Sequence, residues 1–157
     1  MPMIRTFLTF DRAAEEAAHF YVSLFANSRI AHVTRYGDAG PGPKGHAMVV
    51  EFELDGRPFC AMNGGPHFQF SEAISLSVDC DTQAEIDRYW KALSEGGQTS
   101  RCGWLKDRFG VSWQVVPARM AQWMGDPDPA RAQRVMEAML KLDKLEIETL
   151  ERAHRGA

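Results

Sequence analysis

The sequence predicts an α+β protein of two βαβββ modules, whose mixed β-sheets form a concave pocket, followed by a C-terminal helical extension. Three observations predict this fold. Strand and helix periods occur in the same order twice. The two stretches also share similar residues at nearly constant separations, and the end of the chain has only helical periodicity. We place the modules at 1–65 and 66–117 and the extension at 118–157, within a single structural domain.

In the first module, apolar runs and one amphipathic stretch alternate in the order strand, helix, strand, strand, strand. Asp11 is a plausible N-cap for the helix. A loop rich in Gly and Pro at 38–45 separates the second and third strands, and Asp55-Gly56 joins the last two as a tight hairpin turn. The predicted elements are a strand at 4–10, a helix at 11–25, and strands at 30–36, 46–54 and 57–62.

The second module repeats this order. Gly96-Gly97 ends its helix, as a C-terminal glycine commonly does, and Pro117 ends its last strand. The predicted elements are a strand at 73–79, a helix at 82–94, and strands at 98–101, 103–106 and 111–116. One such unit has too little apolar area to be stable alone, so we expect the two to share a concave surface.

Residue matches indicate that the modules are copies. The matches agree in order and in element type, which favours duplication over the chance similarity of apolar strands and amphipathic helices. The second copy lacks the loop at 38–45, which explains its shortest separation. The matches are 8–11 with 76–79, 20–24 with 89–93, and 56–59 with 110–113.

The C-terminal extension has two predicted helices. Asp128-Pro129 is typical of an N-cap followed by the first helical residue, and this helix is expected to reach about Leu142. A second, shorter helix is predicted over 146–154. Their charges balance, which favours a solvated outer face above a core-facing apolar stripe. Clamping a dimer is the alternative role.

Composition excludes several functional classes. The 157 residues are 45% hydrophobic and 25% charged, which is ordinary for a globular protein. The net charge of −3, without a run of Lys and Arg, argues against binding to nucleic acid or to an anionic membrane surface. No stretch has the roughly 20 apolar residues of a membrane span, and no signal peptide is recognisable. Three scattered cysteines predict neither disulfides nor a thiolate zinc site, so we expect a reducing cytoplasm.

Four stretches resemble the vicinal-oxygen-chelate superfamily, and within it the PhnB-like branch, which is labelled as a 3-demethylubiquinone-9 3-methyltransferase domain. The superfamily includes glyoxalase I, extradiol dioxygenases and the bleomycin and fosfomycin resistance proteins. The resemblance covers residues 3 to about 117 and continues into the tail. The stretches are FLTFDRAAEEAAHFYVSLF, MNGGPHFQFSEAISLSVDC, CGWLKDRFGVSWQVVP and DPDPARAQRVMEAML.

The resemblance implies four metal-ligand positions, one on the first and one on the last strand of each module. In this chain they fall at Arg5 or Thr6, at Cys60, at Ala73 and at Gln114. Only Gln114 is a residue type that the superfamily uses, because Arg cannot coordinate a metal and Ala has no donor atom. We therefore predict no metal and no cofactor, with a divalent metal on an unusual ligand set as the alternative.

Other signals for chemistry are weak. The five histidines have neither HxH nor HExxH spacing. The glycines of Asn63-Gly64-Gly65-Pro66 precede an aromatic stretch rather than a helix, which favours a linker between modules over the glycine-rich turn of a methyl-transfer cofactor. Cys60 and Cys80 are predicted core residues. Cys102 is a candidate for an exposed thiol, and neither an adjacent His nor a clear basic partner marks it as an activated thiolate.

The remaining candidate site is the concave pocket itself. Aromatic side chains with a few amide donors are typical of a small-molecule site, and equally of a well-packed core. The candidate ligand-binding residues are Met62, Asn63, Phe68, Trp104, Trp113 and Gln114.

The sequence thus predicts a PhnB-like protein, of unassigned activity and uncertain enzymatic status, that binds a small organic molecule without a metal. One alternative is a metal-dependent enzyme of the glyoxalase or dioxygenase type. The other is a resistance protein that sequesters a drug-like molecule. A homodimer is expected in each case, and the catalytic residues stay unknown.

Overall fold

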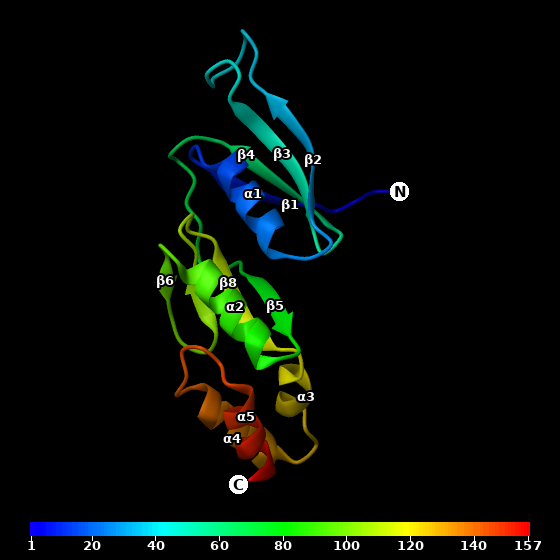
Figure 1. Cartoon of the computed structure of the whole chain (residues 1–157), viewed down its shortest axis with the longest axis vertical. Coiled ribbons are helices and arrows are strands. Elements are labelled where there is room, and N and C mark those ends of the chain that lie inside the picture. Colours follow the sequence, from blue (N-terminus) through cyan, green and yellow to red (C-terminus); the bar gives the residue numbers. More distant parts are fainter. The chain divides into compact units, whose positions relative to one another are not determined.

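The computed structural model describes all 157 residues and divides the chain into two compact units, Met1–Gln69 and Phe70–Ala157 (Figure 1). Each unit contains one four-stranded mixed sheet covered by one helix on one face. The second unit also contains the three C-terminal helices. This is the predicted α+β fold of two βαβββ modules with a helical extension.

The first unit follows the predicted element order. Its sheet has the order β1-β4-β3-β2, in which β1 is parallel to β4 and the other pairs are antiparallel. The hairpin turn between β3 and β4 lies at Asp55-Gly56, where both residues have positive φ, as predicted. The elements are β1 (Thr6–Phe10), α1 (Ala14–Leu24), β2 (Arg29–Arg35), β3 (Ala47–Leu54) and β4 (Arg57–Asn63).

Small residues bring α1 close to this sheet. Ala14, Ala17 and Ala18 are fully buried on the helix, where their short side chains let the backbone approach the strands. On the sheet, the rings of Phe52 and Phe59 stack across neighbouring strands, with their centroids 5.5 Å apart. One apolar helix face and one apolar sheet face thus form the core of the unit.

The start of α1 differs from the prediction. The N-cap residue is Ala13 rather than Asp11, and it offers no side-chain hydrogen bond. The missing cap comes from β4 instead, because the Asn63 side-chain oxygen accepts from the Ala14 N–H at 2.9 Å. The Asn63 amide also donates to the Ala47 carbonyl at 2.9 Å. Asn63 can reach the helix because it pairs with Phe10, the last residue of β1.

The second unit repeats the topology with the sheet order β5-β8-β7-β6, and β5 is parallel to β8. The first strand begins at Leu76 rather than at Ala73, since Ala73 lies in a turn in which its N–H donates to the Ser71 hydroxyl. The elements are β5 (Leu76–Cys80), α2 (Gln83–Ser94), β6 (Gln98–Thr99), β7 (Trp104–Lys106) and β8 (Ser112–Pro117).

Strand register corrects one of the three repeat matches. Phe10 pairs with Asn63 in the first sheet, and Cys80 pairs with Pro117 in the second. Phe10 therefore corresponds to Cys80, whereas the sequence match aligned Leu8 with Leu76. The turn between strand and helix is consequently one residue shorter in the second module than in the first. The alternation of apolar residues caused this error. Every second residue of a strand is apolar, so an alignment shifted by two residues matches the same pattern.

A buried carboxylate fixes the hairpin between β7 and β8. Asp107 is only 3% exposed, and one of its oxygens accepts from the N–H groups of Phe109 and Val111, at 2.9 and 3.0 Å. The other oxygen accepts from the Trp113 indole N–H at 2.8 Å. A buried carboxylate needs such donors to offset the loss of its hydration. Together they hold the turn in one conformation.

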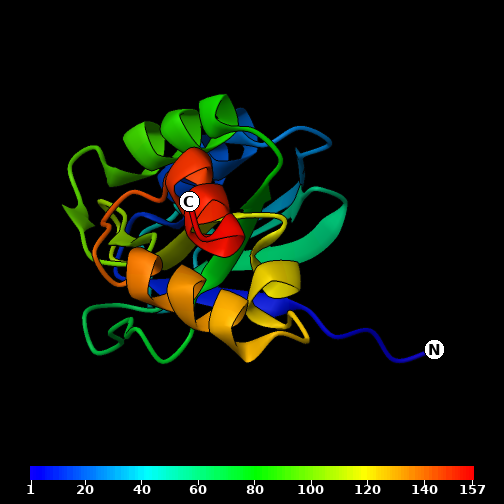
Figure 2. The same cartoon turned by 90° about the horizontal axis from the view of Figure 1, so that it is seen from below.

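The C-terminal helices pack on each other and on the second module (Figure 2). Their buried core consists of Trp123, Val135, Leu145 and Leu150. As predicted, Asp128 caps the second of these helices, which ends at Met139 rather than near Leu142. The first one was not predicted, because it has only five residues. The helices are α3 (Met120–Met124), α4 (Pro129–Met139) and α5 (Ile147–Arg155). None of the helices is long and apolar enough to cross a membrane.

We expect Asn63→Ala to lower the free energy of unfolding by about 1–3 kcal/mol, because it leaves a helix N–H and a strand carbonyl without a partner. Urea unfolding followed by circular dichroism measures the change. Asn63→Asp is the matched variant. It keeps an acceptor at the helix N-terminus, where a negative charge is favoured, so its loss should be smaller. Wild-type stability in Asn63→Ala would contradict the capping role.

Candidate functional site

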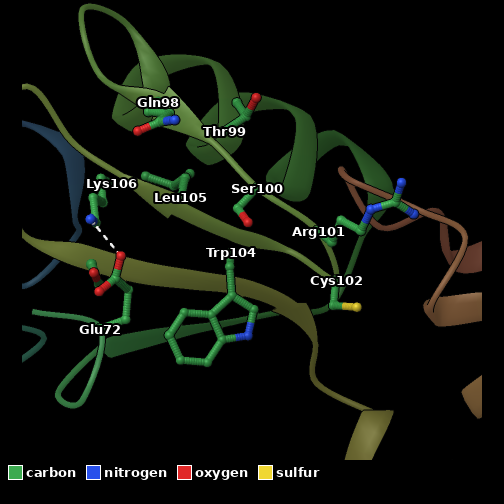
Figure 3. Close-up of a pocket in the computed structure, with 10 residues that line it drawn as sticks. Glu72, Gln98, Thr99, Ser100, Arg101, Cys102, Trp104, Leu105 and Lys106 are labelled. Atoms are coloured by element: carbon green, nitrogen blue, oxygen red, sulfur yellow. Dashed lines mark ion pairs between the residues drawn. The ribbon is translucent and has the colours of Figure 1, made fainter.

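The second unit contains a cavity of about 470 Å³ beside the strands β6 and β7 (Figure 3). Hydroxyl, amide and charged groups surround one indole ring, whose apolar surface forms part of the lining. The lining residues are Glu72, Gln98, Thr99, Ser100, Arg101, Cys102, Trp104, Leu105, Lys106 and Ser112.

Strand alternation places the central side chains of the cavity on one face of the sheet. Trp104 and Lys106 are two residues apart on β7, so they point to the same side. Lys106 pairs directly with Ser112 on β8, and Trp104 with Gln114. At one end of the cavity, the Lys106 ammonium forms an ion pair of 2.5 Å with Glu72 (Figure 3). This hydrogen bond lowers the pKa of the Glu72 carboxyl.

Ser112 is the unusual member of the lining. The residue is 1% exposed, and its hydroxyl has no hydrogen-bond partner within the protein. A buried hydroxyl without a partner costs free energy that a bound ligand could recover. Ser112 is therefore a lining residue whose hydroxyl has no hydrogen-bond partner in the protein itself.

A turn with left-handed backbone angles lies at the other end of the cavity and positions Trp104. Cys102 and Gly103 have φ angles of 60° and 81°. A side chain on Gly103 would meet the Val115 carbonyl oxygen at 2.6 Å, so only glycine fits there. The turn is tied to the C-terminal extension, because the N–H groups of Cys102 and Gly103 donate to the carbonyls of Leu142 and Asp143, both at 2.8 Å.

The predicted site residues of the second unit have three different environments. Trp104 lines the cavity. Trp113 is 2% exposed and bound to Asp107, which makes it a core residue rather than a wall of the cavity. Gln114 shares the face of Trp104 but lies outside the lining, and its amide donates to the Ser75 hydroxyl at 2.9 Å.

The other three predicted site residues lie in the first unit. Asn63 caps α1, and Met62 is half-buried at the end of β4. Phe68 is 57% exposed, beyond the end of that strand. The glycines that follow Asn63 open no helix, so they do not form the phosphate-binding turn of a nucleotide-type cofactor.

Sequence reasoning missed the polar members of the cavity, above all Lys106, Glu72 and Ser112. The alternation of Trp104 and Lys106 on one strand was a usable signal for Lys106. Glu72 and Ser112 gave no signal, because an ion pair and a missing partner exist only in the folded chain.

The metal-ligand positions implied by the superfamily hold groups that do not fit a divalent cation. The Arg5 guanidinium donates to the Glu51 carboxylate and, at 3.9 Å, to the Cys60 sulfur. Burial raises the pKa of the Cys60 thiol, which keeps it protonated at neutral pH. In the second module, Ala73 lies in a turn and the amide of Gln114 is engaged by Ser75. No group of three His, Cys, Asp or Glu side chains is arranged to hold a metal ion.

A family model and a solved structure assign the chain to the same protein family. The family model described as 3-demethylubiquinone-9 3-methyltransferase matches residues 2–116. A PhnB protein from Bacillus cereus, titled a putative 3-demethylubiquinone-9 3-methyltransferase, is 38% identical, with a TM-score of 0.68 over 73% of this chain and 99% of that chain. Protein PA1353 from Pseudomonas aeruginosa shares the fold at 23% identity, with a TM-score of 0.62 over 74% and 98% of the two chains. No functionally curated protein matches the chain.

The environments of the cysteines predict an order of reactivity. Burial raises the pKa of Cys80 to about 12, helped by the nearby carboxylates of Glu85, Asp79 and Asp81. At pH 8 such a thiol is only about 0.01% thiolate, the reactive form. Cys60 is also buried, whereas Cys102 is partly exposed.

We therefore expect one fast-reacting thiol per native chain at pH 8, measured with a chromogenic disulfide reagent. Cys102→Ser should remove the fast phase, and urea should make all remaining thiols reactive. A fast phase that persists in Cys102→Ser would contradict the assignment.

Proposed function

We propose that this chain, which belongs to the 3-demethylubiquinone-9 3-methyltransferase family, binds a small organic molecule in its second unit without a divalent metal. The binding site in this proposal is the cavity beside β6 and β7. Family membership alone does not give this function, because one fold serves many chemistries. The support comes from the side chains of the cavity.

The observation that carries the proposal is the buried, unpartnered hydroxyl of Ser112 in the wall of a cavity with an indole face. A volume of about 470 Å³ lies within the range of small-molecule sites, roughly 300–1,000 Å³. Trp104 offers a flat apolar surface, and the Ser112 hydroxyl offers an oriented hydrogen bond. An apolar wall with a few open polar groups favours a small organic ligand over water alone.

Independence from metal is supported by the chemistry of the implied ligand positions. Arg5 places a positive charge beside Glu51 and Cys60, which are the potential donors nearest to it. A divalent cation there would meet electrostatic repulsion and would have to compete with the guanidinium for the carboxylate. These groups stabilise one another as an ion pair and so take the donor atoms away from a metal.

A neutral aromatic amide, 1-naphthamide, is a suitable probe of this site because its rings match the indole and its carbonyl can accept from Ser112. We expect Trp104→Ala to weaken binding about tenfold or more, by loss of aromatic contact. Ser112→Val should weaken it roughly threefold to tenfold, by loss of one hydrogen bond. Isothermal titration calorimetry measures both dissociation constants.

The matched control is Trp90→Ala, which removes a half-buried tryptophan of α2 outside the cavity lining. It should leave the dissociation constant unchanged, and thermal melting checks that each variant is folded. Equal losses in Trp104→Ala and Trp90→Ala would show that the probe does not use this cavity.

Metal content separates the proposal from a glyoxalase- or dioxygenase-type metalloenzyme. We expect less than about 0.1 equivalent of zinc, nickel, manganese or iron per chain after purification without chelator, and unchanged binding of 1-naphthamide after dialysis against EDTA. Native mass spectrometry of the same sample would detect a co-purifying ligand and would test the predicted homodimer. Stoichiometric metal that is lost together with probe binding would overturn the proposal in favour of the metalloenzyme.

A further inference from the structure

The cavity of the second unit has more positive than negative charge. Arg101 and Lys106 contribute two cations to its lining, and Glu72 contributes the one carboxylate. The whole chain, in contrast, has a net charge of −3. The Arg101 guanidinium donates to the Leu140 carbonyl at 3.3 Å and points away from Trp104 (Figure 3), so the Lys106 ammonium is the cation available to an anionic ligand.

The two members of the ion pair differ in how firmly the fold holds them. Lys106 is on β7, where pairing with Ser112 on one side and Gln98 on the other fixes its backbone. Glu72 is in the turn before β5, and its side chain is 61% exposed. An ion pair this exposed contributes little to stability. Glu72 can therefore leave Lys106 at little cost.

The strand register places a second donor beside the ammonium. Lys106 and Ser112 are directly opposite each other on antiparallel strands, so their β-carbons are about 4.5–5.5 Å apart on the same face. The flexible four-carbon side chain of Lys106 can bring its ammonium close to the unpartnered Ser112 hydroxyl, so that one carboxylate could accept a hydrogen bond from each of them. Trp104, two residues before Lys106, lies on the same face.

We propose that the ligand of this cavity is a planar organic acid whose carboxylate displaces Glu72 from Lys106 and accepts a hydrogen bond from Ser112, while its rings lie against Trp104. Glu72 is then the internal counter-ion of the empty cavity, and the ligand replaces it. This inference rests on the proposed function and names the ligand class of the same site. A neutral ligand, in contrast, would leave the pair of Glu72 and Lys106 intact.

The test compares two probes of the same shape, 1-naphthoate and 1-naphthamide, which differ in charge. Calorimetry gives the dissociation constants for the wild type, Glu72→Gln and Lys106→Met. We expect Glu72→Gln to tighten 1-naphthoate about threefold to fivefold, because the ligand no longer competes with an exposed ion pair. Lys106→Met should abolish the preference for 1-naphthoate, and 1-naphthamide should change less than about twofold in both variants.

Asp38→Asn is the matched control. It also removes one carboxylate from an exposed pair with lysine, Lys44 at 2.7 Å, but in a loop of the first unit. It changes the net charge as Glu72→Gln does, so tighter binding of 1-naphthoate in both variants would show a general charge effect and overturn the inference. Higher salt should weaken 1-naphthoate more than 1-naphthamide.

The outcomes distinguish this inference from the function on which it rests. If both probes bind with equal affinity and respond to Trp104→Ala, the cavity is a binding site and the organic-acid inference is wrong. If neither probe binds to the wild type or to Glu72→Gln, the proposed cavity is wrong and the inference fails with it. Tighter binding of 1-naphthoate in Glu72→Gln alone supports both.

Discussion

The arrangement of the second unit depends on one buried carboxylate. Asp107 binds two backbone N–H groups of its own turn and the indole N–H of Trp113 at the start of β8. These bonds fix the length of the turn and so the register of β7 on β8, because a slip of one residue would turn every side chain to the other face. The register in turn sets Lys106 opposite Ser112. The arrangement of the candidate site thus depends on the hydrogen bonds that the buried Asp107 carboxylate accepts.

The two modules show the same scaffold stabilised in different ways. In the first module, the side chain of Asn63, from the last strand, caps the start of the helix. The corresponding position in the second module is Pro117, which has no such side chain, and there the helix begins with a local capping box of Thr82 and Glu85. The second module is also tied to the C-terminal extension, in part through Gln83, whose side chain bonds to Leu145 and Ile147. The two modules thus share one topology but differ in the contacts that stabilise it.

The metal-ligand positions implied by the sequence resemblance are engaged in contacts within the protein. Arg5 forms an ion pair with Glu51, and Gln114 forms a hydrogen bond with Ser75. The Arg5 guanidinium and the Gln114 amide nitrogen thus have partners within the protein, whereas the hydroxyl of Ser112 has none. The hydrogen-bonding group without a partner therefore lies in the wall of the cavity beside β6 and β7.

The sequence by itself determined the element order, the duplication, the hairpin at Asp55-Gly56 and the helix start at Asp128, because periodicity, turn chemistry and capping are local in the chain. It also identified Trp104 as a candidate site residue. The tertiary structure decided that Trp113 is core, that Asn63 caps a helix, and that Glu72, Lys106 and Ser112 share one cavity. Each of these facts depends on contacts that strand register and burial create, and the order of residues does not display them.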